Sequence, residues 1–177
     1  TELDLARSIQ QSALPSPIWF PGGRIFSTTL PAQEVGGDFY DAFDLPDGRA
    51  ALALGDVSGK GVSAALFMVR ASLLLRSAAA ATDPQRAVTQ INGMLVKSNP
   101  EMMFVTLFFA VWDPLAEKLT CVNAGHNPPI MVRADGSFER LSRRSGPAIG
   151  AMSGQEYPSW EIPFRNGDLL TIYTDGI

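Results

Sequence analysis

The period of apolar and polar positions changes several times along the chain, and each change marks the boundary of an expected element. Short apolar runs bounded by turn residues predict strands, and the β-branched and aromatic residues in many of these runs suit a pleated, half-buried surface. The first runs occupy residues 24–30, 38–43 and 50–55, and turn residues at 45–48 separate the last two. Later strands are expected at residues 104–112, 118–123, 129–133, 159–164 and 168–173, with one more after the turn at 134–136.

Two adjacent segments follow a helical period instead. The first predicted helix covers residues 61–81, and the second begins at Pro84 and ends near residue 97. Apolar residues recur three and four positions apart in both, which predicts one apolar face on each helix. The first helix carries Val62, Leu66, Val69 and Leu73 on one face, and the second directs Val88, Ile91 and Leu95 inward.

A shorter helix is predicted at residues 2–14, where Leu5, Ile9 and Ala13 recur every four residues before two prolines. A helix this short is marginal alone, so it needs either its own domain or a second copy as a partner. We therefore divide the chain into an N-terminal linker helix at residues 1–16 and a main domain at residues 17–177.

The order of elements indicates the fold class. Strands, then two helices, then more strands are typical of an α+β protein with antiparallel sheets, whereas a parallel doubly wound fold alternates strands and helices. A chain of 177 residues with 46% hydrophobic residues is long enough for one sizeable core. We expect one main domain.

Composition excludes several classes of function. Charged residues make up 18% of the chain and the net charge is −4, so no overall basic field attracts nucleic acid or an anionic membrane. We see neither an apolar run approaching the roughly 20 residues that cross a bilayer nor a signal peptide, which favours a cytoplasmic protein. Cys121 is the only cysteine, so it forms no intrachain disulfide and is expected to fill core.

Glycine is combined with acidic or amide side chains at the ends of four predicted strands, in residues 34–38, 55–61, 123–129 and 173–176. A rigid sheet fixes a carboxylate at a strand end, and neighbouring glycines allow close approach. Each such carboxylate alone could equally serve a turn. Three of them together would repel one another unless Mg²⁺ or Mn²⁺ neutralised them. The three candidates are Asp38, Asp56 and Asp175.

Two other site types fit less well. Gly59 and Lys60 precede a helix, but a phosphate-binding loop also needs glycine at position 54 and a hydroxyl at 61, where Leu54 and Gly61 stand. His126 is the only histidine, so no second histidine could serve in a Ser/His/Asp catalytic triad. Histidine-rich metal sites are excluded for the same reason. We expect His126 to hold its loop by hydrogen bonds.

Five motifs carry a family resemblance: EVGGDFYD, GDVSGKGVSAAL, FVTLFFA, NAGHNPP and LLTIYTDGI. In this order they resemble the bacterial branch of the metal-dependent protein phosphatases (PPM, type 2C-like), the stage II sporulation protein E and RsbU-like group. The likeness runs from the first helix to the last residue. It implies a four-layer α/β/β/α sandwich of two mainly antiparallel sheets, with a binuclear Mn²⁺ or Mg²⁺ centre at one end.

The resemblance also implies roles for individual residues. Asp56 would bridge both metals with the Val57 backbone carbonyl beside it, Asp38 would bind one metal directly or through water, and Asp175 would bind the other. Asp38 and Asp56 are therefore also the expected catalytic residues. The metals would activate a water for in-line attack on phosphoserine or phosphothreonine, so no nucleophilic side chain and no phosphoenzyme are needed.

The chain departs from the family pattern in two places. Gly37 stands where the eukaryotic type 2C pattern has glutamate, as in the bacterial branch. Family members also continue through a helix to a final strand with another metal-binding aspartate. We therefore expect a domain truncated at its C-terminus, a weaker second-metal site and reduced catalysis by this fragment.

The resemblance implies partners as well. The first helix is similar to a segment that joins this domain to an upstream sensor or receiver domain, and that segment commonly mediates pairing, so a homodimer is expected through it. The usual substrates in the family are phosphorylated anti-sigma-factor antagonists of the STAS type.

Three functions remain to be distinguished. The leading hypothesis is a phosphoprotein phosphatase in bacterial signalling. The first alternative is a catalytically weak or inactive regulatory binding module, although such a module has no reason to keep carboxylates that repel one another. The second alternative is a metal-dependent nuclease or small-phosphate hydrolase, which lacks the basic or aromatic surface that nucleic acid needs.

Overall fold

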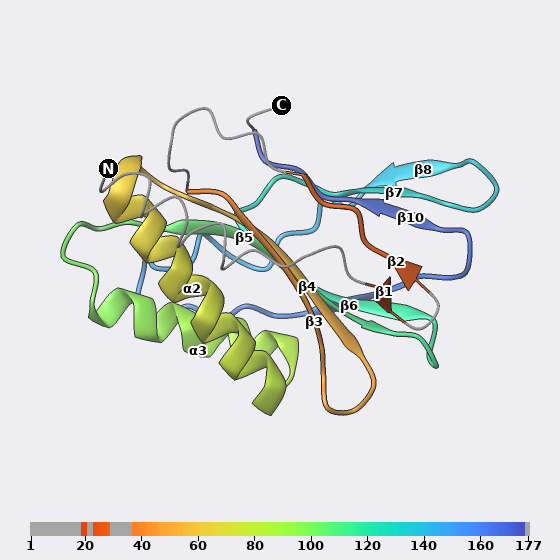
Figure 1. Cartoon of the computed structure of the whole chain (residues 1–177), viewed down its shortest axis with the longest axis horizontal. Helices are drawn as coiled ribbons and strands as arrows, with labels where there is room; N and C mark the ends of the chain where they lie inside the picture. The colour runs from red at the N-terminus through yellow and green to blue at the C-terminus, as the bar shows by residue number, and fades with distance from the viewer. Residues whose placement is uncertain (1–18, 21–22, 29–36, 176–177) are drawn as a thin grey trace.

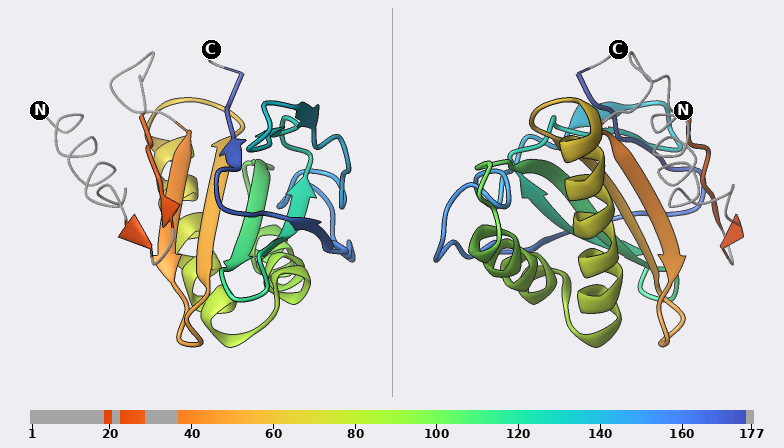
Figure 2. Two further views of the ribbon diagram at one scale, coloured as in Figure 1. Left: turned by 90° about the vertical axis from the view of Figure 1, so that its right-hand side faces the viewer. Right: turned by 60° about the vertical axis from the view of Figure 1, so that its left-hand side comes forward.

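The computed structural model describes residues 19–20, 23–28 and 37–175. In this part of the chain, a five-stranded antiparallel sheet carries two helices on one face and a three-stranded antiparallel sheet on the other (Figures 1 and 2). These residues supply three layers of the expected α/β/β/α sandwich. The predicted helix at residues 2–14 lies outside the described residues.

The large sheet has the strand order β3-β4-β5-β6-β9, and the small sheet has the order β10-β7-β8. All their pairings are antiparallel, which confirms the predicted fold class. The large sheet consists of β3 (Phe39–Asp44), β4 (Ala50–Val57), β5 (Val105–Asp113), β6 (Lys118–Ala124) and β9 (Trp160–Pro163). The small sheet consists of β7 (Ile130–Val132), β8 (Phe138–Arg140) and β10 (Leu169–Thr171).

The predicted strand at residues 24–30 is wrong over most of its described length. Only Arg24 belongs to a strand, β2 (Gly23–Arg24), which pairs with β1 (Trp19–Phe20), and residues 25–28 are irregular. Phe26 is 85% exposed, so its apolar side chain is not held by a sheet. β1 is two residues long, and among the residues that the structure describes it pairs only with β2.

The two helices confirm the predicted boundaries. α3 (Pro84–Lys97) begins where the Asp83 carboxylate accepts a hydrogen bond from the Arg86 backbone N–H at 2.9 Å, with Pro84 at the first position. Val88, Ile91 and Leu95 are buried as predicted. α2 (Gly61–Ala81) packs beside α3 on the same face of the large sheet.

The predicted face of α2 is wrong. Three of its four residues, Val62, Leu66 and Leu73, are 45%, 64% and 63% exposed, whereas the fourth, Val69, is partly buried against the core. The opposite face is buried because its alanines let the helix approach the sheet closely, while Phe67, Met68 and Leu75 fill the remaining space. α2 has apolar residues on both faces. A prediction made from the spacing of the large residues alone therefore chose the exposed face as the buried one.

By length and composition α2 could also cross a membrane, so the expectation that no such run exists is wrong. The core helix of a globular domain meets the same criteria, and α2 contributes eight buried residues to its own domain.

The helix is tied to β3 by an ion pair: the Arg76 guanidinium donates to Asp41 Oδ2 at 2.7 Å and lies 4.9 Å from the Phe43 ring centre. The Asp41 side chain is fully buried.

We expect Arg76→Met to destabilise the fold by about 2 kcal/mol, because it leaves the Asp41 carboxylate buried without its partner. The loss lies below that of a fully buried pair, since the Arg76 side chain is 42% exposed. Chemical denaturation measures the change. Arg86→Met is the matched control: its pair with Asp83 is 76% and 53% exposed, so stability should not change measurably. Equal losses in both variants would contradict this account.

Side chains of the large sheet alternate between two cores. Along β5, Phe109 contributes to the core under the helices and Phe108 to the core between the sheets. Cys121 is fully buried in the second core, as predicted. The same alternation places Asp56 on β4 and Thr106 on β5 on the face toward the small sheet.

Candidate metal centre

Asp38 and Asp56 meet at one end of the large sheet. Asp38 immediately precedes β3, Asp56 is the last residue but one of β4, and Phe39 pairs with Gly55 between them. Close packing around the two strands requires glycine. A Cβ on Gly55 would lie 2.4 Å from the Phe39 ring, and a Cβ on Gly37 would lie 2.7 Å from the Val57 carbonyl oxygen. The glycines therefore bring both carboxylates and the Val57 carbonyl into one small region.

Asp175 reaches this region from the small sheet. It follows β10 by four residues and is exposed, whereas Asp38 and Asp56 are half-buried. The neighbouring Thr174 hydroxyl donates to Asp38 Oδ2 at 2.8 Å. This hydrogen bond joins the segment after β10 to the carboxylate before β3. The cluster is therefore built from both sheets and is open to solvent on the side of Asp175.

The pKa of Asp56 is raised from 3.8 to about 7 by burial and, to a smaller extent, by its acidic neighbours. Burial is the largest cause, followed by a hydrogen bond and the negative charge of Asp38 and by the charge of Asp175. A divalent cation would remove this repulsion, so the oxygen-rich cluster fits Mg²⁺ or Mn²⁺. Within residues 19–20, 23–28 and 37–175, no three acidic, histidine or cysteine side chains already stand close enough to hold a metal. The roles of Asp38, Asp56, Val57 and Asp175 as ligands stay a prediction.

His126 lies beside the acidic cluster and holds its loop, as predicted. It is 2% exposed; its backbone N–H donates to Asn123 Oδ1 at 2.8 Å, and its Nδ1 lies 2.9 Å from the Thr106 hydroxyl. Burial lowers the pKa of His126, against the opposing effects of the Tyr173 and Thr106 backbones and of the Asp38 and Asp175 charges. We infer a neutral imidazole at pH 7.

Sequence reasoning missed Thr106 and Thr174. Both lie inside quoted motifs, FVTLFFA and LLTIYTDGI, which was the available signal. Thr106 stands directly opposite Asp56 in the β4–β5 pairing. The two hydroxyls therefore belong to the candidate site, Thr106 through its contact with His126 and Thr174 through its hydrogen bond to Asp38.

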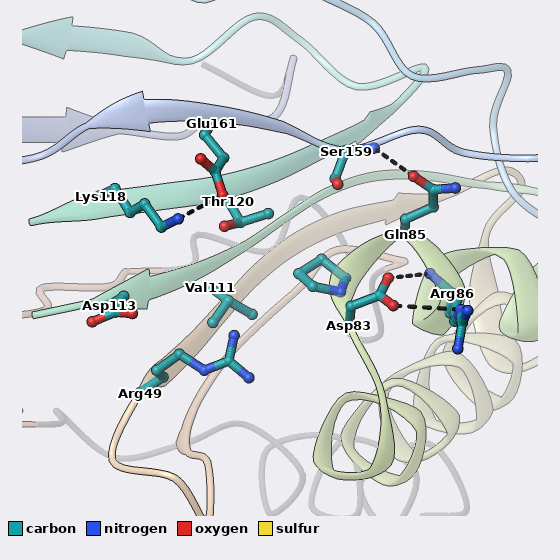
Figure 3. Close-up of a pocket in the computed structure, with 11 residues that line it drawn as sticks. Arg49, Asp83, Gln85, Arg86, Val111, Asp113, Lys118, Thr120, Ser159 and Glu161 are labelled. Atoms are coloured by element: carbon teal, nitrogen blue, oxygen red, sulfur yellow. Dashed lines mark hydrogen bonds and ion pairs between the residues drawn. The ribbon is translucent and has the colours of Figure 1, made fainter. Parts of the chain in front are cut away.

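A cavity of about 490 Å³ lies at the other end of the large sheet, beside the start of α3 (Figure 3). Its three basic side chains already form ion pairs with acidic neighbours, so the cavity presents no surplus charge. The pairs are Arg49–Asp47, Arg86–Asp83 and Lys118–Glu161. This cavity is separate from the acidic cluster and does not contribute to the candidate centre.

Comparison with known sequences gives consistent matches. A family model described as stage II sporulation protein E (SpoIIE) matches residues 46–177. The chain is 34% identical to Protein IcfG of Synechocystis sp., over 99% of the chain and 32% of that protein. It is 27% identical to the phosphoserine phosphatase RsbP of Bacillus subtilis, over 99% of the chain and 45% of that protein. The chain thus spans about a third to a half of the length of these relatives.

Solved structures share the fold. The RsbU and RsbW domains of Rv1364c from Mycobacterium tuberculosis match with 30% identity and a TM-score of 0.73, over 83% of this chain and 41% of that one. The SiaA-PP2C domain of Pseudomonas aeruginosa matches with 21% identity and a TM-score of 0.77, over 99% of this chain and 71% of that one. The predicted type 2C-like fold is confirmed.

Proposed function

Because the chain belongs to the SpoIIE family of PP2C-type phosphatase domains, we propose that it is the catalytic domain of a metal-dependent serine/threonine phosphoprotein phosphatase in bacterial signalling. The observation that carries the proposal is the placement of Asp38 and Asp56 on paired strands at one end of the large sheet, where the Thr174 hydroxyl, next to Asp175, donates to Asp38. Carboxylates whose pKa values are perturbed by acidic neighbours are typical of metal and catalytic sites.

The residues of the chain have distinct tasks in this proposal. Asp56, with the Val57 carbonyl and Asp38, would hold one divalent cation, and Asp56 with Asp175 would hold a second. When bound, the cations supply an activated water and neutralise charge on the phosphoryl oxygens. The Thr174 hydroxyl fixes the orientation of the Asp38 carboxylate. Hydrolysis by water needs no side-chain nucleophile.

The proposed substrate is a phosphorylated anti-sigma-factor antagonist of the STAS type. Its support is the family and the relative RsbP, which is named a phosphoserine phosphatase. The exposed position of Asp175 leaves the cluster open to a side chain on the surface of another protein. An upstream sensor or receiver domain, a homodimer formed through residues 1–16 and a cytoplasmic location belong to the same proposal.

The proposal predicts that phosphate release depends on a divalent cation. Release from a phosphorylated STAS-domain protein should require Mn²⁺ or Mg²⁺, fall to background with EDTA and return when excess Mn²⁺ is added. A phosphate-release assay on the protein measures this, with the phosphorylated substrate alone as the control. Release that persists in EDTA would contradict the metal centre. Binding of the phosphoprotein without release at any Mn²⁺ concentration would favour the regulatory binding module.

A further inference from the structure

We infer that Ser58 is a positioning residue for the metal centre, which holds the peptide between Val57 and Ser58 so that the Val57 carbonyl points toward the side of β4 where Asp38 lies. The inference rests on the proposed function, in which this carbonyl is a metal ligand. It gives a role to a serine of the motif GDVSGKGVSAAL that is neither a proposed ligand nor a participant in the reaction.

Ser58 is joined to the residue before β5 by two hydrogen bonds. Its backbone N–H donates to the Phe104 carbonyl at 2.8 Å, and its hydroxyl oxygen accepts from the Phe104 N–H at 2.9 Å. In a regular antiparallel ladder the Phe104 N–H would donate to the Ser58 carbonyl. The hydroxyl takes the place of that carbonyl, so the chain stays attached to the neighbouring strand at the point where it leaves β4. Gly59, with φ of 94°, then turns the chain toward α2.

This attachment sets the direction of the Val57 carbonyl. The Val57 C=O and the Ser58 N–H belong to one planar trans peptide, in which the two groups point in opposite directions. The Ser58 N–H points toward β5, so the Val57 carbonyl points toward β3 on the other side of β4. There a Cβ on Gly37 would lie 2.7 Å from the carbonyl oxygen, and Gly37 immediately precedes Asp38. The hydrogen bond on the β5 side therefore aims the carbonyl at the acidic cluster.

The contact with the segment before β3 holds the same part of β4 less tightly. The Val57 N–H donates to the Gly37 carbonyl at 3.3 Å, which is longer than the roughly 2.9–3.0 Å typical of such bonds. The two shorter bonds of Ser58 are therefore the stronger attachment. Without the hydroxyl, one bond to Phe104 and one long bond to Gly37 would remain, and the carbonyl would sample a wider range of directions.

The exposure of the hydroxyl separates a positioning role from a purely structural one. The bond between the Phe104 N–H and the Ser58 hydroxyl is open to solvent, so water can replace it at a small cost in stability. A water molecule satisfies the Phe104 N–H but does not tie it to the chain at Ser58. Loss of the hydroxyl should therefore affect cation binding more than it affects the fold.

The test compares Ser58→Ala, which removes the hydroxyl, with Ser58→Thr, which keeps a hydroxyl on Cβ. Free Mn²⁺ measured by electron paramagnetic resonance gives the Mn²⁺ dissociation constant of the protein. Hydrogen exchange followed by NMR in EDTA reports the amides of residue 58 and Phe104 without metal. We expect Ser58→Ala to raise the dissociation constant about 10-fold or more and to lower the protection of both amides. Ser58→Thr should keep the dissociation constant within about 3-fold of the wild-type value and restore the protection.

Ser145→Ala is the matched control, because Ser145 makes the same pair of bonds to another strand of the large sheet. Its N–H donates to the Asn123 carbonyl at 2.7 Å, and its hydroxyl oxygen accepts from the Asn123 N–H at 3.1 Å. Ser145 is not adjacent in sequence to a proposed ligand. The substitution should lower stability and leave the Mn²⁺ dissociation constant unchanged.

An unchanged dissociation constant in Ser58→Ala would overturn the inference. An equal rise in Ser145→Ala would also overturn it, because general loosening of the sheet would then explain both variants. If the wild-type protein bound no Mn²⁺, the proposed function would fall, and the exchange data would decide separately whether the hydroxyl holds the peptide. Unchanged protection of the two amides in Ser58→Ala would show that it does not.

Discussion

Asp56→Asn should lower kcat/KM for the phosphoprotein by at least about a thousandfold, equivalent to about 4 kcal/mol of transition-state stabilisation. Asp56 is the carboxylate on which burial, Asp38 and Asp175 all act. The amide removes its negative charge from the middle of the cluster while nearly preserving its shape. Cation affinity and turnover should fall together in a phosphate-release assay.

The same substitution should change how stability depends on pH in the metal-free protein. The folded-state pKa of Asp56, about 7, lies above its ordinary value of 3.8. The folded state therefore binds more protons between these values, so the contribution of Asp56 to stability is present below pH 4 and is lost as pH rises through 7. Asp56→Asn should remove this loss and stabilise the metal-free protein at pH 8.

Asp47→Asn is the control, because Asp47 is exposed in the turn before β4, at the opposite end of the large sheet, and pairs with Arg49. It should leave turnover unchanged and should not stabilise the protein at pH 8. Near-normal turnover by Asp56→Asn would rule out the proposed centre. Loss of turnover together with lower stability at pH 8 would indicate damage to the fold in place of loss of a ligand.

The sequence predicted those elements whose two faces differ in polarity. α3 has one apolar side and a clear start at Asp83 and Pro84, and the structure confirms both. α2 carries apolar residues on both faces, so its buried side depends on the shape of the sheet, where alanines such as Ala64 and Ala71 pack better than Leu66. Periodicity carries no information about that choice.

The candidate site divides in the same way. Asp38 and Asp56 could be predicted because glycine and aspartate at strand ends form a local pattern. Asp175 was predicted in the same way, but the hydrogen bond that joins its neighbour Thr174 to Asp38 was not, because the two residues are 136 positions apart in sequence and meet only after both sheets have packed. The contact of Thr106 with His126 likewise depends on the registers of β5 and β6.

Gly55→Ala should destabilise the protein by about 3 kcal/mol, lowering Tm by about 6–12 °C. The added Cβ would lie 2.4 Å from Phe39 Cε1 and 3.1 Å from Val105 Cγ1, and all three residues belong to paired strands of the large sheet. The Phe39 ring is 1% exposed and cannot move into solvent without opening the core. Thermal unfolding measures the loss.

Gly93→Ala in α3 is the opposite case and the matched control. A Cβ there meets nothing within 4 Å, so the substitution should stabilise the helix by about 0.5–1 kcal/mol through the lower entropy of the unfolded chain.

Gly55 also lies between Phe39 and Asp56, and any displacement of β4 that accommodates the new methyl group moves Asp56 relative to Asp38. Gly55→Ala should therefore lose Mn²⁺ affinity at temperatures where it is still folded, while Gly93→Ala keeps it. A Gly55→Ala protein with unchanged Tm and unchanged Mn²⁺ affinity would show that the close packing of β3 on β4 does not set the spacing of the two carboxylates.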